Sequence, residues 1–333
     1  MKLTTTYLGL TLAHPFMPGA SPLADNLDTV LQLEDAGASA IVMRSLFEEQ
    51  ILRDRFGFVY YTNDHDDATE IAVGSYFPLA EEFAFGPDEY LEQLRQIKSR
   101  VSIPVIASLN GTASEGWLQY ARMLQKAGAD AIELNFYHLA TEPSEDGTAV
   151  ERRLLDLAAV VKESIAVPIA VKLSPFYSSL PNLAACLERM GVHGLVLFNQ
   201  FYQPDMDPEE LDSAPRLKLS TSADLLLRLQ WLAILSKHFH GSLAASGGVH
   251  QPIDAVKAVM SGADAVQLVS ALLRNGPGHL AYVLKGFNAW GDAHGYESID
   301  QMRDAMSMTH CADPRAFERG NYIRILQSWH RTP

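Results

Sequence analysis

The sequence predicts an α/β protein whose parallel strands close into a (β/α)8 barrel. Short apolar runs rich in β-branched and small residues recur along the chain. Stretches with apolar residues at helical spacing lie between them, and several of these stop at a glycine: Gly37, Gly128, Gly191 and Gly262. Strands that are almost continuously apolar and alternate with helices are typical of a parallel sheet covered by helices.

Eight such runs occur along the chain. In order they are Pro15–Ser21, Ala38–Ser45, Ile103–Asn110, Ala129–Asn135, Val167–Leu173, His193–Asn199, Ser242–Ser246 and Ala263–Ser270. Eight strands, each followed by a helix, make a TIM (β/α)8 barrel. The alternative is an open doubly wound sheet, which usually has fewer strands and needs a glycine-rich turn after the first one. The turn PGASP at residues 18–22 is not of that kind.

The length fits one barrel domain over residues 1–333 with additions, because a barrel of this type needs roughly 250 residues. No linker or repeat indicates a second domain. The surplus lies mainly in Glu48–Phe85, a loop after the second strand that is rich in aromatic and acidic residues, and in a C-terminal helical tail. Because the loops that follow barrel strands surround the active-site mouth, we expect Glu48–Phe85 to cap it.

Composition and charge narrow the possible partners. Hydrophobic residues make up 47% of the chain, and no apolar run is long enough to span a bilayer. The formal net charge of −14 argues against nucleic acid or an anionic membrane as a partner. The N-terminal residues MKLTTTYLGLTLAHP lack a signal-peptide core, so a cytoplasmic protein is expected. An anionic ligand must then be bound by nearby hydrogen-bond donors, because the electrostatic field of the negatively charged protein repels it.

Cysteine and histidine usage indicates neither a metal site nor an iron–sulfur cluster. The two cysteines, Cys186 and Cys311, each lack a second cysteine at ligand spacing. The eleven histidines form no HExxH pattern. The cluster of His65, Asp66 and Asp67 is interpreted as a solvated loop.

The end of the seventh predicted strand indicates a phosphate site. Gly247 and Gly248 follow that strand, and Ser270 ends the eighth. The loops after the last two strands of a barrel commonly hold a phosphate, because glycines let the backbone approach and the loop amides act as donors. We therefore expect a phosphorylated cofactor or substrate.

The C-terminal ends of the predicted strands carry a polar rim, which is where barrel enzymes place their reactive groups. Lys172 is its most informative member, because an ammonium in an apolar strand is costly unless it meets an anion or an electron-rich ring. Two roles remain open: a cation beside a flavin or a substrate anion, or a Schiff-base nucleophile. The non-functional alternative is a lysine that merely reaches solvent from a strand end.

An ordered set of motifs supports a family resemblance. It comprises PFM and AS within the first strand run, RS at the end of the second, then ELN, VKL, a strand ending in Asn199, SGG and VQLVSAL. In this order and spacing the set resembles the dihydroorotate dehydrogenase family of FMN flavoproteins, most closely its soluble class 1 members, which serve pyrimidine biosynthesis. The resemblance extends to GYESIDQM near the C-terminus.

The resemblance implies FMN as cofactor and a role for each matching residue. Ala20, Ser21, Arg44, Ser45, Ser108, Asn135 and Lys172 would contact or flank the flavin ring, with Arg44 where the family usually has lysine. Lys172 would counter the charge that develops near ring atoms N1 and O2 on reduction. Ser246, Gly247, Gly248, Val269 and Ser270 would hold the phosphate, with Val269 in place of a usual glycine. Asn135 and Asn199 would hydrogen-bond the substrate.

The loop after ELN departs from the family pattern. Class 1 members continue with a serine, the catalytic cysteine and Pro-Asn, whereas this chain continues with Phe136, Tyr137, His138, Leu139 and Ala140. His138 thus takes the position of the cysteine, and it is chemically competent to accept the substrate's C5 proton while C6 gives hydride to the flavin. Tyr137 is a second candidate.

Two further family segments are replaced. The stretch that lines the substrate pocket is replaced by IAVGSYFPLAEEF at residues 71–83, and the glycine-rich loop before the seventh strand by LKLSTSADLLLRL at residues 217–229. The residues that contact the flavin therefore match the family pattern better than the residues that contact the substrate. The resemblance implies dihydroorotate as the substrate and leaves a different substrate open.

The sequence thus predicts an FMN-dependent dehydrogenase acting on a CH–CH bond of a small, planar, anionic substrate, with His138 as base. The electron acceptor must be external, either diffusible or a partner protein. A homodimer is possible through Glu48–Phe85 or the segment Asn321–Ile323. Two alternatives stay open: a non-redox barrel that uses Lys172 as a Schiff-base aldolase does, and a flavin-binding subunit without catalysis of its own.

Overall fold

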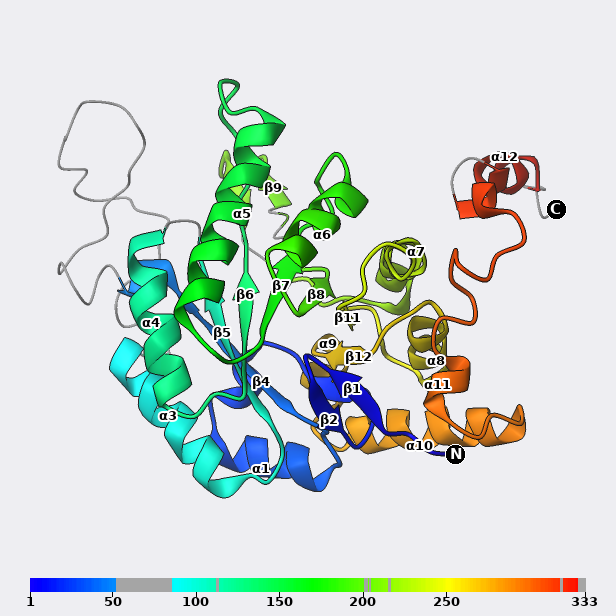
Figure 1. Ribbon diagram of the computed structural model, residues 1–333, viewed down its shortest axis with the longest axis horizontal. Helices are drawn as coiled ribbons and strands as arrows, with labels where there is room; N and C mark the ends of the chain where they lie inside the picture. Colours follow the sequence, from blue (N-terminus) through cyan, green and yellow to red (C-terminus); the bar gives the residue numbers. More distant parts are fainter. Residues whose placement is uncertain are drawn as a thin grey trace.

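The computed structural model describes residues 1–51, 86–111, 114–200, 203, 205–214, 217–317 and 320–328, and at its centre eight parallel strands form a barrel (Figure 1). They are β3 (Phe16–Pro18), β4 (Ile41–Phe47), β5 (Val105–Asn110), β6 (Ala131–Asn135), β7 (Ile169–Leu173), β8 (Gly194–Leu197), β11 (Ser242–Ser246) and β12 (Ala265–Leu268). Their order in the sheet is β3-β12-β11-β8-β7-β6-β5-β4. Each predicted run overlaps one of these strands, which confirms the TIM barrel.

The first and last strands of this sheet meet through Ser39. Its backbone N and its Oγ both donate to the carbonyl oxygen of Phe16, at 3.0 and 2.8 Å. Because Ser39 leads into β4 and Phe16 lies in β3, these two bonds bring the free edges of the sheet together.

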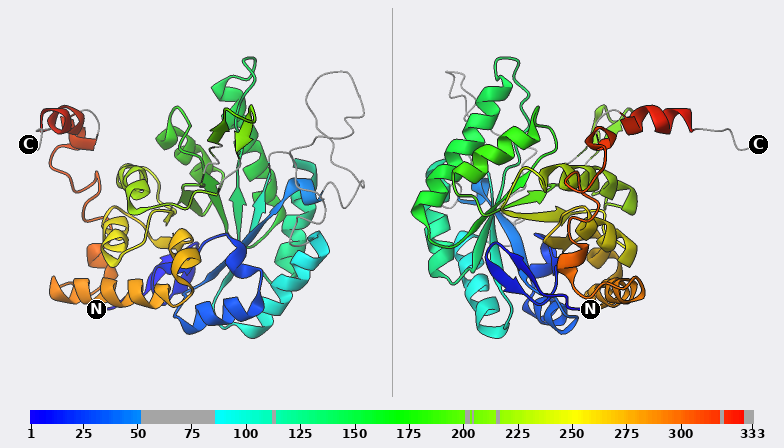
Figure 2. Two further views of the ribbon diagram at one scale, coloured as in Figure 1. Left: turned by 180° about the vertical axis from the view of Figure 1, so that it is seen from behind. Right: turned by 45° about the vertical axis from the view of Figure 1, so that its right-hand side comes forward.

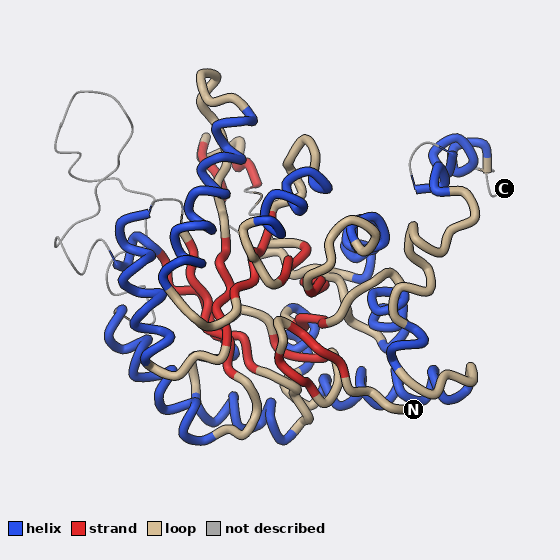
Figure 3. Tube along the Cα trace, viewed as in Figure 1, coloured by secondary structure: helices blue, strands red, loops and turns tan. Residues whose placement is uncertain are grey.

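Helices surround the strands on all sides, as the tube in Figure 3 shows. They are α1 (Leu27–Asp35), α3 (Pro87–Arg100), α4 (Ser114–Lys126), α5 (Gly147–Ser164), α6 (Leu180–Arg189), α7 (Leu225–Leu235), α8 (Pro252–Met260), α9 (Ser270–Asn275), α10 (His279–Ala293), α11 (Ile299–Met302) and α12 (Gly320–Gln327). The four predicted stop glycines adopt φ values of +92°, +102°, +81° and +117°. Glycine tolerates this left-handed conformation without strain, so each helix ends there and the chain turns into the next strand.

An N-terminal hairpin of β1 (Thr5–Tyr7) and β2 (Leu10–Leu12) packs into the barrel interior at the end where the strands begin (Figure 2). The strands make room for it with small inward-facing residues, namely Ala40, Ala131, Ala170, Ala244 and Ala265. At Gly194 even a Cβ would lie 2.5 Å from Cδ2 of Leu8. Side chains alternate along a strand, so residues two positions further on also point inward, one layer closer to the mouth.

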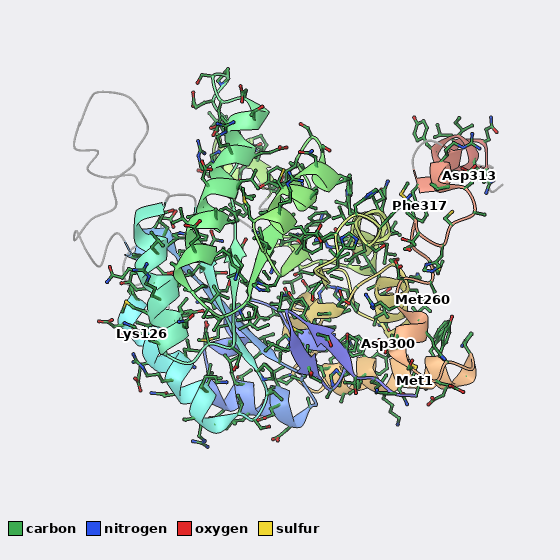
Figure 4. The ribbon with its side chains drawn as sticks, viewed as in Figure 1. Met1, Lys126, Met260, Asp300, Asp313 and Phe317 are labelled. Carbon is green, nitrogen blue, oxygen red and sulfur yellow. The ribbon has the colours of Figure 1, made fainter. Side chains whose placement is uncertain are left out.

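The N-terminus of the chain packs against the helices α10 and α11, which follow β12. The Met1 ammonium donates to Asp292 at 2.6 Å, and Ile299 N donates to the carbonyl of Lys2, so Met1 lies near Asp300 (Figure 4). After α11 the chain runs past α7 to α12, with Asp313 and Phe317 marking this C-terminal segment at the edge of the molecule. The predicted helical tail is thus confirmed. Its Tyr322, Ile325 and Leu326 are more than 60% exposed.

Residues 52–85 of the predicted capping loop lie outside the described residues, and so does the His65–Asp67 cluster. The expectation that Glu48–Phe85 covers the mouth therefore stays a prediction. None of the helices that the structure describes is both long and apolar enough to cross a membrane. Within the described ranges, no group of at least three His, Cys, Asp or Glu side chains is placed to hold a metal ion.

Candidate active site

Three polar side chains from three strands meet inside the barrel, one layer above the alanines. The Lys172 ammonium donates to Glu133 Oε1 and to Gln267 Oε1, both at 3.2 Å. Gln267 Nε2 in turn donates to Glu133 Oε2 at 2.6 Å. Lys172 is 4% exposed, and the other two are fully buried. This is a closed hydrogen-bonded cluster with one positive and one negative charge.

The cluster explains how a lysine is tolerated in the middle of an apolar strand. Taking an ammonium out of water is costly unless a carboxylate and further acceptors compensate, and Glu133 and Gln267 supply both. Lys172 was predicted from the sequence, whereas Glu133 and Gln267 were missed. The usable signal was the two-residue alternation in ELN, which puts Glu133 on the same face as Asn135.

A pair of serines, Ser45 and Ser108, lies beside this cluster, and their predicted contact with the flavin stays a prediction. They are in register on β4 and β5, and their Oγ atoms are 2.8 Å apart. Tyr90 of α3 fixes both strand ends, because its hydroxyl donates to the carbonyl of Arg44 at 2.7 Å and accepts from Ser108 N at 3.1 Å. Burial raises the pKa of Tyr90, which keeps the phenol neutral.

Two asparagines form the next polar contact toward the mouth. Asn199 Nδ2 donates to Asn135 Oδ1 at 2.7 Å, so the two predicted substrate contacts do lie together. Asn135 pairs with Lys172 in the strand register, and Asn110 pairs with Asn135. Arg44 instead forms an ion pair with Asp25 at 3.1 Å, with its side chain 34% exposed. Its predicted place beside a flavin ring stays a prediction.

The segment after β3 reaches the same mouth. Ser21 is buried, and its Oγ donates to the carbonyl of Gly19 at 2.9 Å; Ala20 is half-buried. A Cβ at Gly19 would lie 2.9 Å from Val269 Cγ2 and 3.0 Å from Gln267 Cβ. Glycine is thus required where this segment crosses the end of β12, which brings Ala20 and Ser21 close to the cluster.

The two glycines of the turn after β11 have a left-handed backbone conformation. Gly247 and Gly248 adopt φ values of +87° and +85°. The amide of Gly248 donates to Ser220 Oγ at 3.1 Å, and Ser220 N donates to Ser270 Oγ at 3.0 Å. The predicted phosphate residues Gly248 and Ser270 are therefore linked through Ser220, a buried residue that sequence reasoning missed.

Gly248→Ala is expected to lower stability by about 2–4 kcal/mol and to lower the flavin content of the purified protein. A Cβ there would lie 2.5 Å from Leu225 N and 2.7 Å from its Cα, and backbone atoms cannot move aside cheaply. Gly295→Ala is the matched control, because Gly295 has a similar φ of +77° with nothing within 4 Å of a Cβ. Urea unfolding and flavin absorbance check both variants. Equal effects of the two substitutions would show that the turn is not a close-packed cradle.

His138 lies on the loop between β6 and α5, in contact with two charged residues. Its Nε2 is 3.0 Å from Glu145 Oε2 and 3.0 Å from Arg153 Nη1, and Arg153 also pairs with Glu145. These contacts hold the pKa of Glu145 below its usual value, and the hydrogen bond with His138 contributes most to this shift. His138 and Glu145 also line a cavity of about 230 Å³, together with Ser174 and Tyr177. The half-buried Tyr137 precedes His138.

Residues 84–290 match the protein family described as dihydroorotate dehydrogenase. The chain belongs to the dihydroorotate dehydrogenase family. The predicted resemblance is thereby confirmed, and the chain is an oxidoreductase of this family.

Subunits of dihydroorotate dehydrogenases and of a dihydropyrimidine dehydrogenase are similar to the chain over most of its length. The catalytic subunit of dihydroorotate dehydrogenase B (NAD(+)) from Thermoplasma acidophilum is 28% identical over 90% of this chain and 97% of the relative. The corresponding subunit from Methanothermobacter thermautotrophicus is 26% identical over the same shares. The NAD-dependent dihydropyrimidine dehydrogenase subunit PreA from Escherichia coli is 22% identical over 90% of this chain and 75% of the relative.

The residue types at the ends of the strands are compatible with the flavin that the family resemblance implies. Close-packed glycines at 19 and 248 keep the backbone free of side chains, a lysine sits at the base of the mouth, and hydroxyls and amides surround both. Lys172 Nζ is already engaged by Glu133 and Gln267, whereas a Schiff base requires an amine that is free to attack the substrate. Family membership and this ion pair together favour the redox interpretation over the aldolase.

Proposed function

We propose that this protein is an FMN-dependent dehydrogenase that oxidises a CH–CH bond of a small, planar, anionic substrate, with dihydroorotate as the first candidate. The observation that carries the proposal is the buried Lys172, held by Glu133 and Gln267 at the base of the mouth in a member of this family. The names of the relatives support a dihydropyrimidine ring as the substrate class.

Different residues of the mouth would bind the flavin ring and the flavin phosphate. Ala20, Ser21, Arg44, Ser45, Ser108, Asn135 and Lys172 would hold the ring of FMN, and Ser246, Gly247, Gly248, Val269 and Ser270 its phosphate. Bound FMN supplies the hydride acceptor at N5. Lys172 places a fixed positive charge where negative charge develops, and because its partners are buried this charge is weakly screened. Asn135 and Asn199 orient the substrate through their amides.

His138 is proposed as the base that removes the substrate proton. Nε2 lies 3.0 Å from both Glu145 Oε2 and Arg153 Nη1, and it can donate to the carboxylate only in the tautomer in which it does not accept from the guanidinium. In that tautomer the lone pair of the ring is on Nδ1. Nδ1 has no hydrogen-bond partner within the part of the chain that the structure describes, so it is free to accept a proton. The Glu145 carboxylate then stabilises the imidazolium that forms.

Glu145→Gln is expected to lower turnover about ten- to hundredfold, the range of one charge-assisted hydrogen bond. The variant keeps the shape of the side chain but loses the charge that orients and stabilises His138. Steady-state kcat with dihydroorotate and a dye acceptor measures the effect. Glu142→Gln is the control, because Glu142 is an exposed carboxylate on the same loop. Unchanged turnover in Glu145→Gln would contradict a role for the pair.

A substrate comparison tests the proposed function. The purified protein, supplied with FMN and an artificial electron acceptor, is assayed with dihydroorotate and with dihydrouracil, which has the same ring without the carboxylate. Turnover of dihydroorotate alone supports the anionic substrate. Turnover of dihydrouracil alone would assign the activity named for the Escherichia coli relative, and turnover of neither would reject the dihydropyrimidine class.

The proposal also covers the domain organisation, the localisation and the electron acceptor of the protein. We propose one FMN-binding barrel domain over residues 1–333 in a cytoplasmic protein. The electron acceptor is external, and the description of several relatives as subunits supports a partner protein over a diffusible acceptor. A homodimer through the exposed C-terminal segment around Tyr322 and Ile323 stays a prediction.

A further inference from the structure

A buried arginine lies against the glycine turn. Arg228 is in α7, is 6% exposed, and donates from Nε to the carbonyl of Ser246 at 2.6 Å and from Nη1 to the carbonyl of Asp224 at 2.6 Å. A Cβ placed on Gly247 would lie 3.0 Å from Nη2 and 3.3 Å from Nε. The guanidinium thus fills the space beside Gly247 that a side chain would otherwise occupy.

The guanidinium of Arg228 makes no direct ion pair in the described part of the molecule. No carboxylate among the described residues lies within ion-pair distance of the guanidinium, and Nη2 has no hydrogen-bond partner there. The nearby acids are engaged elsewhere: Asp224 accepts from Thr221, and Asp254 accepts from Ser222, His250 and Gln251. Burial lowers the pKa of Arg228, with Asp224 partly opposing the shift. A buried, unpaired cation of this kind is costly unless an anion binds it.

The surroundings of the guanidinium are suited to a phosphate. Ser246, Gly247 and Gly248 follow one another beside it, and Ser220 links Gly248 to Ser270. The guanidinium fork matches phosphate oxygens better than a point charge does. The net charge of −14 makes a local cation more important, because the overall field repels an anion. Arg228 also lies in the stretch 217–229, which replaces the glycine-rich loop of the class 1 members that the chain resembles.

We propose that Arg228 binds the phosphate group of the cofactor, so that a buried guanidinium adds to the backbone amide of Gly247 and the hydroxyl of Ser270. The proposal rests on the proposed function, since it takes FMN as the phosphate carrier. It implies that this chain distinguishes a flavin phosphate from an unphosphorylated flavin through one side chain on α7.

Flavin binding with and without the phosphate tests this assignment. The full chain, freed of flavin, is titrated with FMN and with riboflavin, which has the same ring and ribityl chain but no phosphate, and fluorescence quenching gives each Kd. Arg228→Met is expected to weaken FMN binding about ten- to hundredfold, the range for losing a charged hydrogen bond, and to leave riboflavin binding unchanged. Arg95→Met, which removes an exposed arginine on α3, is the control and should change neither.

Each other outcome overturns the assignment in a distinguishable way. Equal weakening of FMN and riboflavin by Arg228→Met would show that Arg228 only supports the turn. Equal affinity of the unaltered protein for the two flavins would exclude a phosphate site while leaving a flavin function intact. Binding of neither flavin would reject the proposed function and this inference with it. If Arg228→Met does not fold, Arg228→Gln, which keeps a donor for Ser246, is expected to show the same FMN-specific loss, and its absence contradicts the proposal.

Discussion

Replacing Lys172 with methionine is expected to lower the free energy of unfolding by about 3–5 kcal/mol and to abolish reduction of bound flavin. The stability loss follows because Glu133 is fully buried and would keep a charge without a partner. The functional loss follows because no other cation of the described residues lies in this cluster. Urea unfolding measures the first effect, and anaerobic reduction of the flavin measures the second.

The double variant Lys172→Met with Glu133→Gln separates the two effects. It removes both charges and keeps an amide at position 133 that can hydrogen-bond Gln267, so most of the lost stability should return. Flavin reduction should not return, because the cation is still missing. A Lys172→Met protein as stable as the unaltered one would contradict a stabilising ion pair between Lys172 and Glu133, and full activity would remove Lys172 from the mechanism.

Replacing His138 with alanine is expected to lower turnover by about 10²- to 10⁴-fold while FMN stays bound. The histidine lies on the loop after β6 and contacts Glu145 and Arg153, not the cluster around Lys172, so its removal should leave the flavin site intact. The flavin spectrum and steady-state kcat are measured on the same preparation. Tyr137→Phe is the companion variant. Unaltered turnover in His138→Ala would point to Tyr137 or to a water molecule as the base.

The barrel was predictable because its signals are local. Each strand is a short apolar run, and the glycines at 37, 128, 191 and 262 end helices through a backbone conformation that the residue type itself favours. The hairpin of β1 and β2 was not predicted. Its place inside the barrel depends on alanines in four different strands and on Ala40 just before a fifth, and no single stretch of sequence reveals such a set.

The sequence predicted which residues of the candidate site lie at the strand ends. It did not predict which side chains contact them. Ser45 with Ser108, and Asn135 with Asn199, lie together because every strand of a barrel ends at the same mouth. The partners of Lys172 come from β6 and β12, whose approach depends on how the strands stagger around the barrel. Arg228 was overlooked because it lies in an apolar helix, and its meaning appears only once α7 is packed against the turn at Gly247.

An anaerobic titration with L-dihydroorotate, followed through the visible flavin band, tests the proposed activity most directly. The purified protein is first supplied with FMN so that loss of cofactor during purification does not decide the result. Bleaching of the band by dihydroorotate is the expected result, because it demonstrates cofactor and substrate in one step. A flavin band that stays oxidised would reject dihydroorotate as the substrate, and a protein that remains colourless after FMN is added would contradict the flavin site itself.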